Sequence, residues 1–286
     1  MNFTEYKRIA NALKMQPSNK YSTWDNIMQL CLNMYEDNQD YLKYCLKLSK
    51  AVKLSAQRLL LQNRDVRFED LYWQAVKFEA PHLFDSYLLY LERKRLEQDR
   101  FYSPKRKQLN KHGLIQSLQD LEDDKLDILS ISMPPGTQKT TLEKFFASWI
   151  IGRHPDDFSL FFSHSGDITR MFYDGVMDIT TNSDEYCWQE IFPDVKFHST
   201  NAKRETINFN KYKPFSNIQC TSVGSKNAGK VRANRYLYCD DLIGGIEEAL
   251  NKNILDKLWR IYGTDAKQRK MDGCKEIHIA TRWSVH

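Results

Sequence analysis

The chain has 286 residues, of which 41% are hydrophobic and 13% aromatic, and its formal net charge at pH 7 is +5. With 11 glycines and 8 prolines, the composition is that of a folded protein and excludes disorder over most of the length. This length is typical of one large domain or two domains of medium size. The small positive charge permits an anionic partner without identifying one.

The sequence shows no targeting signal and no membrane segment. The N-terminus lacks the apolar core of a signal peptide, and the longest strongly apolar run, Phe145 to Ile151, is far shorter than the ~20 residues of a membrane helix. The six cysteines contain no Cys-x-x-Cys pair, which predicts reduced thiols in an intracellular protein: Cys31, Cys45, Cys187, Cys220, Cys239 and Cys274. The final residues, 277–286, read as a strand and a loop, so we expect a fragment of a longer protein.

Residues 1–100 have a helical pattern. Apolar residues recur at helical spacing from Ile27 to Met34, and again from Phe84 to Leu91 after the helix-starting Pro81. A dense cationic stretch follows, from Arg93 to Lys111. This stretch is either a solvated helix face or a contact for DNA or a nucleotide, and the sequence leaves both interpretations open.

From residue 126 onward, predicted strands and helices alternate, which is typical of a parallel sheet with crossover helices. The helices are indicated by apolar stripes that start at Leu142, at Ile168 and near Leu250. The predicted strands are Leu126 to Met133, residues 158–162, Thr206 to Phe209, Ile218 to Val223, Tyr236 to Cys239 and Ile277 to Ala280. The fold class is therefore α/β, with a helical region in front.

The segment between the first strand and its helix, residues 133–141 (MPPGTQKTT), has the order of a phosphate-binding loop. Such a loop needs a tight turn with inward N–H groups, a lysine for the β- and γ-phosphates and a hydroxyl for magnesium. Lys139 and Thr140 supply the last two. The usual pattern is broken, because Met133 and Gln138 stand where it has glycine.

Two carboxylates, Asp240 and Asp241, follow the apolar strand Tyr236 to Cys239. In a parallel sheet the carboxyl ends of the strands share an edge, so Asp240 and Lys139 are expected on the same side. One carboxylate can hold Mg²⁺ and the next can polarise the attacking water. The alternative is a solvated turn after a core strand. Thr281, at the end of another strand, is a candidate sensor of the γ-phosphate.

Four segments together resemble the ATPase domain of the large terminase subunit of tailed bacteriophages and prophages, the motor that packages DNA into a procapsid. They are SISMPPGTQKTTLEKFFASWIIGRHPDD, WQEIFPDVKF, YLYCDDLIGGIEEAL and IHIATRWSVH. The resemblance covers about residues 101–286. It implies a P-loop NTPase of the ASCE type, with a mostly parallel sheet flanked by helices, preceded by the all-helical region 1–100.

The resemblance also implies the roles of individual residues. Lys139 and Thr140 bind ATP and Mg²⁺, Asp240 is the first acid of the Walker B segment, Asp241 is the catalytic carboxylate, and Thr281 couples hydrolysis to movement. The loop around the phosphates comprises Pro135, Gly136, Thr137, Gln138, Lys139, Thr140 and Thr141. Tyr102 is expected to stack on the adenine, with Arg106 near the base or the phosphates.

This chain departs from the family at two positions of the loop. The family glycine before the lysine is Gln138, and many relatives have an arginine where this chain has Gly136. Asp241 is also one methylene shorter than the glutamate of many terminases. Family members carry an RNase H-like nuclease domain, which is expected to begin beyond His286, so no nuclease activity is expected here.

The resemblance implies double-stranded DNA, a small terminase subunit and a portal protein as partners, no membrane, and a homo-oligomeric ring that docks transiently on the procapsid in the host cytoplasm. Residues 1–100 are then a lid or a docking region. Three alternatives remain: a nucleotide-binding module with weak hydrolysis because of Gln138, a helicase-like ATPase, and a capsid-docking adaptor. Arg232 and Arg235 are candidates for an arginine finger, whereas His164 and His278 are expected to pack or hydrogen-bond.

Overall fold

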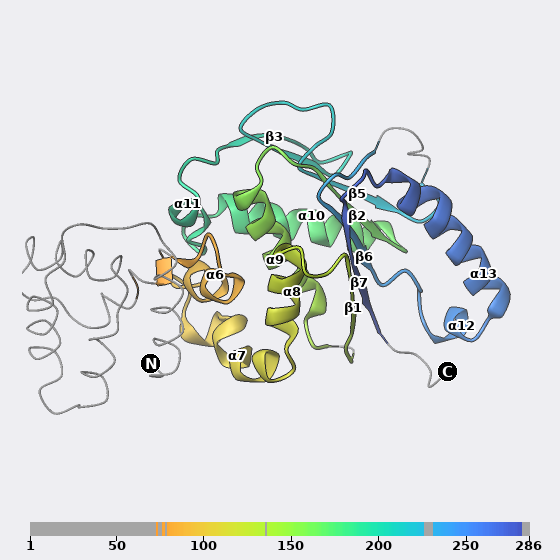
Figure 1. The fold of residues 1–286 in the computed structure, drawn as a ribbon, viewed down its shortest axis with the longest axis horizontal. Coiled ribbons are helices and arrows are strands. Elements are labelled where there is room, and N and C mark those ends of the chain that lie inside the picture. The colour runs from red at the N-terminus through yellow and green to blue at the C-terminus, as the bar shows by residue number, and fades with distance from the viewer. Residues whose placement is uncertain (1–72, 74–75, 78, 135, 226–230, 282–286) are drawn as a thin grey trace, which may run out of the picture. The chain divides into compact units, whose positions relative to one another are not determined.

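The computed structural model describes residues 73, 76–77, 79–134, 136–225 and 231–281 (Figure 1). The chain divides into two units, Met1–Arg93 and Lys94–His286, a few residues before the boundary predicted at residue 100. In the first unit, α6 (Phe84–Leu91) confirms the helix predicted after Pro81, and all of its residues are buried. The helix predicted from Ile27 to Met34 lies outside the described residues.

The second unit is an α/β fold in which strands and helices alternate (Figure 1). Short 3₁₀ turns lie at Glu97–Asp99 and Lys267–Arg269, and a π-helical turn follows α13 at Tyr262–Ala266. The helices are α7 (Tyr102–Lys111), α8 (Leu114–Glu122), α9 (Lys139–Arg153), α10 (Gly166–Thr181), α11 (Trp188–Ile191), α12 (Ile246–Ala249) and α13 (Lys252–Ile261). The strands are β1 (Ile128–Ser132), β2 (Ser159–Ser163), β3 (Phe197–Asn201), β4 (Thr206–Phe209), β5 (Ile218–Ser222), β6 (Tyr236–Asp240) and β7 (Lys275–Ala280).

The strands form one seven-stranded sheet with the order β1-β7-β6-β2-β5-β4-β3. The strands from β1 to β5 in this order are parallel, whereas β4 and β3 are antiparallel additions at one edge. All six predicted strands are present, and β3 is an additional one. The strand predicted at Leu126 to Met133 was expected to be buried, but β1 is an edge strand and Ile128 is 53% exposed.

Apolar side chains from successive strand positions cover the two faces of the sheet, because neighbours along a strand point to opposite sides. On one face, the ring of Phe161 stacks on Phe172 of α10, with centroids 3.8 Å apart. On the other face, Leu160 and Phe162 belong to a buried hydrophobic cluster with Tyr262, which directly follows α13. Figure 1 accordingly shows the sheet between the α9–α10 pair and α13.

The helix starts follow local capping rules. The Ser165 hydroxyl accepts a hydrogen bond from the N–H of Ile168 and caps α10, and the Asn251 side chain caps α13 in the same way. None of the helices in the described ranges is long and apolar enough to cross a membrane. Cys187, Cys220, Cys239 and Cys274 are buried free thiols, as expected from the absence of paired motifs.

A buried ion cluster at the amino-end edge of the sheet surrounds Glu122, at the end of α8. Its carboxylate accepts hydrogen bonds from Arg153 at 3.0 Å, Arg235 at 2.7 Å and the Tyr236 hydroxyl at 2.8 Å, and contacts the His154 ring at 2.6 Å. Burial alone raises the pKa of Glu122, but the His154 hydrogen bond and the Arg235 charge outweigh it and lower this pKa to about 2. The cluster therefore connects α8, α9 and β6.

This cluster corrects one prediction from the sequence. Arg235 was a candidate arginine finger, but it directly precedes the first residue of β6 and its guanidinium is bound to Glu122. It lies at the edge opposite to the carboxyl ends of the strands, so a finger role does not fit. Arg232, the other candidate, is exposed in the segment before β6.

Glu122→Gln is expected to lower the stability of the protein by about 3 kcal/mol near neutral pH, because the folded pKa of about 2 lies below the unfolded value of 4.5. A lowered carboxyl pKa contributes stability above the unfolded value, and this contribution disappears as the pH falls from 4.5 towards 2. Thermal unfolding over this range should therefore depend less on pH in the variant. Glu97→Gln, at an exposed carboxylate, is the control, and equal effects of both changes would contradict the assignment.

Candidate functional site

Three chain segments meet at the carboxyl-end edge of the sheet because β7 lies between β1 and β6. Ser132 of β1 is opposite Ala280 of β7, and Asp240 of β6 is opposite Ile279. Since these strands are parallel, the residues that follow them share one edge. The edge therefore brings together residues far apart in the sequence: Lys139, Thr140, Asp240, Asp241 and Thr281.

The loop after β1 turns through two residues with left-handed backbone angles. Gly136 has φ 76° and Gln138 has φ 61°. For a residue with a side chain this conformation costs about 1 kcal/mol, which explains why phosphate-binding loops place glycine there. The Thr137 hydroxyl donates to the Pro134 carbonyl at 2.8 Å and closes the turn. Pro135 lies outside the described residues.

The helix α9 starts directly at Lys139, and no side chain caps its N-terminus. The N–H groups of a first helical turn have no partners within the helix and carry the positive end of the helix dipole. Along α9, the first N–H group with a backbone hydrogen bond among the described residues is that of Thr141, which donates to the Gln138 carbonyl at 3.1 Å. The start of α9 is therefore suited to an anion.

The side chain of Gln138 is exposed and accepts a hydrogen bond from the ammonium of Lys105 in α7. None of its hydrogen bonds goes to Lys139 or Thr140. Gln138, which departs most clearly from the loop pattern, thus has the backbone conformation usual for glycine, and its side chain is bound to α7.

The ammonium of Lys139 connects the three segments. It donates to the Thr281 hydroxyl at 2.6 Å and to the Met133 carbonyl at 3.2 Å, and its nitrogen is 3.9 Å from Oδ1 of Asp241. Lys139 is only 8% exposed. A lysine held this far from water needs anionic or polar partners, and the loop, β6 and β7 provide them here.

The Thr140 hydroxyl donates to Oδ2 of Asp240 at 2.7 Å, which joins the start of α9 to the end of β6. Asp240 is 1% exposed, and its Oδ1 has no hydrogen-bond partner among the described residues. Burial raises the pKa of Asp240 to about 6, although the Thr140 hydrogen bond and the Lys139 charge oppose the shift. A buried carboxylate with a free oxygen favours a cation.

Asp241 has an unusual backbone conformation, with φ 41°. Its N–H donates to the Ile279 carbonyl at 2.9 Å, and its Oδ1 accepts from the N–H of Thr281 at 3.1 Å. The His164 ring contacts the Asp241 carbonyl, so His164 forms a hydrogen bond, as the sequence predicted. His278 likewise contacts Glu276, at 2.8 Å. The bonds of Asp241 to Ile279 and to the Thr281 N–H orient its carboxylate towards Thr281.

The residue that sequence reasoning missed is Glu143, one turn after Lys139 in α9. It is 2% exposed, and neither carboxylate oxygen has a hydrogen-bond partner among the described residues. Burial raises the pKa of Glu143 well above its usual range, and the charges of Asp240 and Asp241 raise it further. The only signal in the sequence is an acid directly beside the apolar stripe of Leu142, Phe145 and Phe146.

Tyr102 and Arg106 do not take the positions expected of them. Tyr102 has no exposed surface, and its hydroxyl accepts a hydrogen bond from Asn110 at 3.0 Å. Its ring is therefore unavailable to stack on a base in this conformation. Arg106 is 8% exposed, in the same helix. The amphipathic spacing of α7 turns both residues towards the protein interior.

The oxygen atoms of Thr140 and Asp240 are the candidate protein ligands for Mg²⁺. In the parts of the chain that the structure describes, no group of three or more His, Cys, Asp or Glu side chains is arranged as a complete metal site. Mg²⁺ is usually held by one or two carboxylates together with phosphate oxygens and waters. Thr140 and Asp240, with the free Oδ1, fit that mode of binding, in which the phosphates of a ligand complete the coordination.

A scan against models of known protein families gives no match to this chain, and a search of curated proteins gives none either.

Glu143→Gln is expected to stabilise the protein near pH 8, because it removes a buried carboxyl that has no hydrogen-bond partner among the described residues. A folded pKa above the unfolded value of 4.5 makes the parent lose stability as the pH rises above 4.5. The gain in melting temperature should therefore be larger at about pH 8 than at about pH 5. Glu247→Gln, at an exposed carboxylate, is the control; a pH-independent difference would show that Glu143 is not buried in its uncharged form.

Proposed function

We propose that this chain is an ATP-hydrolysing motor domain, a P-loop NTPase of the ASCE type similar to that of phage large terminases, which drives double-stranded DNA into a procapsid. The observation that supports it is the meeting of Lys139, Thr140, Asp240, Asp241 and Thr281 at one edge of the sheet. The loop before α9, the acids that end β6 and the threonine after β7 are joined there by direct hydrogen bonds, although each motif taken alone could be purely structural. A solvated Asp-Asp turn does not account for an Asp240 that is 1% exposed.

In this proposal the start of α9 and Lys139 neutralise the β- and γ-phosphates of ATP. Mg²⁺, held by Thr140 and Asp240, supplies charge compensation for the phosphate oxygens when it is bound. Asp241 orients the attacking water. Its reach is short, but the left-handed backbone at Asp241 and the bond from the Thr281 N–H place its carboxylate 3.9 Å from the Lys139 ammonium.

The Lys139–Thr281 hydrogen bond suggests how nucleotide binding reaches β7. The ammonium has three protons, and two of them are used by Thr281 and Met133. The third proton can bind a phosphate oxygen, and a phosphate that draws the ammonium towards itself weakens its hydrogen bond to the Thr281 hydroxyl. Since Thr281 also donates its N–H to Asp241, the end of β7 responds to the nucleotide and to the catalytic acid together.

The partners belong to the same proposal. They are double-stranded DNA, a small terminase subunit and a portal protein, with the motor acting as a homo-oligomeric ring docked on the procapsid in the host cytoplasm. A helicase-like ATPase would have the same nucleotide site and would differ in its effect on DNA. Strand separation during hydrolysis would support the helicase, whereas movement along an intact duplex would support the motor.

Lys139→Ala is expected to lower both ATP affinity and turnover by at least about a hundredfold, because one ammonium serves the bound phosphates and the transition state. Asp241→Asn should retain binding within about threefold and lower turnover by about 10²–10⁴-fold, since it acts in the chemical step. ATP binding is measured by titration and turnover by phosphate release. Lys196→Ala, at an exposed lysine, is the control. Unchanged hydrolysis in Lys139→Ala would falsify the site.

The second candidate function is a nucleotide-binding module with little hydrolysis, and it rests on Gln138. We expect Gln138→Gly to leave turnover within about threefold of the parent, because the Gln138 side chain is exposed and bound to Lys105 and glycine adopts a φ above zero at little cost. Measured turnover of both proteins distinguishes the candidates. An inactive parent that gains hydrolysis with glycine would favour the binding module.

A further inference from the structure

The antiparallel edge of the sheet has one polar face. In the register of β3, β4 and β5, Ser199 is opposite Asn208, Asn201 is opposite Thr206, and Thr206 is opposite Gln219. Residues that are opposite each other or two apart on a strand share a face. Polar side chains therefore form a continuous row across the three strands: Ser199, Asn201, Thr206, Asn208, Gln219 and Thr221.

The opposite face of β4 and β5 is apolar and covered. Ile207 and Ile218, which are paired between β4 and β5, are almost completely buried. Tyr173 of α10 hydrogen-bonds the Thr200 hydroxyl on that side. In β4 and β5 the polar row is thus not a consequence of strands that are exposed on both faces, and it needs its own explanation.

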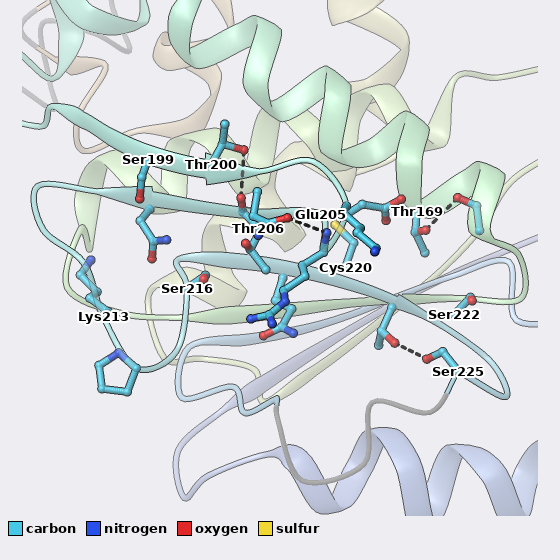
Figure 2. Close-up of a pocket in the computed structure, with 18 of the residues that line it drawn as sticks. Thr169, Ser199, Thr200, Glu205, Thr206, Lys213, Ser216, Cys220, Ser222 and Ser225 are labelled. Atoms are coloured by element: carbon cyan, nitrogen blue, oxygen red, sulfur yellow. Dashed lines mark hydrogen bonds between the residues drawn. The ribbon is translucent and has the colours of Figure 1, made fainter.

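The polar row forms the floor of a cavity of about 520 Å³, which we call the polar trough. Figure 2 shows hydroxyl side chains from several elements around it, among them Ser199 and Thr206 on neighbouring strands and Ser222 at the end of β5. Cavities of this size are typical of small-ligand sites. None of its lining residues belongs to the group around Lys139 and Asp240.

Two side chains of the floor have unused hydrogen-bonding capacity. Asn208 is 5% exposed, and its Oδ1 has no partner among the described residues. The Gln219 amide, which faces the same trough, forms no hydrogen bond within the described part of the chain either. Buried amide groups are normally satisfied, so this floor is suited to a ligand that carries hydroxyl groups.

Three cationic side chains also line the trough: Lys203, Arg204 and Lys213. Lys203 and Arg204, in the turn between β3 and β4, are exposed, and within the described residues neither side chain has an ion pair. Lys213, in the loop before β5, is buried and bound to Asn217 at 2.9 Å and to the Pro155 carbonyl. Glu205 is the acid that lines the same trough. This excess of cations selects an anionic ligand.

We infer that the polar trough binds a sugar phosphate, with its hydroxyl groups on the Asn208–Gln219 floor and its phosphate on Arg204 and Lys203. This chemistry has two sources, a free sugar phosphate or the backbone of an RNA strand, in which each ribose keeps its 2′-hydroxyl. The trough is a binding site separate from the proposed ATP site, and its existence does not depend on hydrolysis.

The test measures binding of two probes, ribose 5-phosphate and a short single-stranded RNA, by the full chain carrying Lys139→Ala, which weakens binding at the proposed nucleotide site. Arg204→Gln and Asn208→Leu are each expected to weaken binding by about tenfold, because they remove a charge-assisted contact and a buried amide. Lys211→Gln is the matched control: it makes the same charge change at an exposed lysine outside the trough.

Binding of ribose 5-phosphate that is weakened by Arg204→Gln but not by Lys211→Gln supports the inference, with a free sugar phosphate as the source. Binding of the RNA alone, with the same pattern of variants and a decrease at higher salt, supports it with an RNA backbone as the source. Failure of both probes to bind, or equal losses in Arg204→Gln and Lys211→Gln, overturns it. Arg204 is exposed, so its variant tests the inference even where Asn208→Leu does not fold.

Discussion

The parallel alignment of β1, β7 and β6 is the constraint on which the candidate site depends. Because β7 lies between the other two strands, Thr281 emerges between the loop that precedes α9 and the acids that end β6. One ammonium, that of Lys139, can then reach Met133 and Thr281 at hydrogen-bond distance. A change in the strand order would separate these groups, since each is fixed at the end of its own strand.

The site concentrates buried charge that the protein itself only partly compensates. Asp240 and Glu143 are both less than 3% exposed, and three of their four carboxylate oxygens have no hydrogen-bond partner among the described residues. The nearby charges of Asp240 and Glu143 raise the pKa of Lys144, while its own burial lowers it more strongly. Such an arrangement costs stability in the free protein, and under the proposed function a bound cation with its phosphates would offset part of that cost. This is the expected compromise where function requires charges that folding disfavours.

Much of the fold could be predicted from local patterns. Thr206 to Phe209 was predicted as a strand and has the same bounds as β4, and apolar runs located the other strands to within a few residues. The strand β3, with the sequence FHSTN, was missed because it is largely exposed and mostly polar, so it lacks the apolar run that indicated the other strands. The prediction that the first strand is buried was wrong. Burial depends on which strands pair on each side, and β1 is at the edge of the sheet, paired with β7 alone.

The sequence by itself determined the parts of the site: a lysine and a hydroxyl at the start of a helix, and acids and a threonine at the ends of strands, each fixed by its own element. Only the tertiary structure decided how these parts meet. It joined Thr140 to Asp240 and Lys139 to Thr281, bound Arg235 to Glu122 at the far edge and buried Tyr102. It also left the Glu143 carboxyl without a hydrogen-bond partner in the part of the chain that the structure describes. The physical reason is range: dihedral preferences and hydrophobic periodicity act over a few residues, whereas strand order and burial depend on residues a hundred or more positions apart.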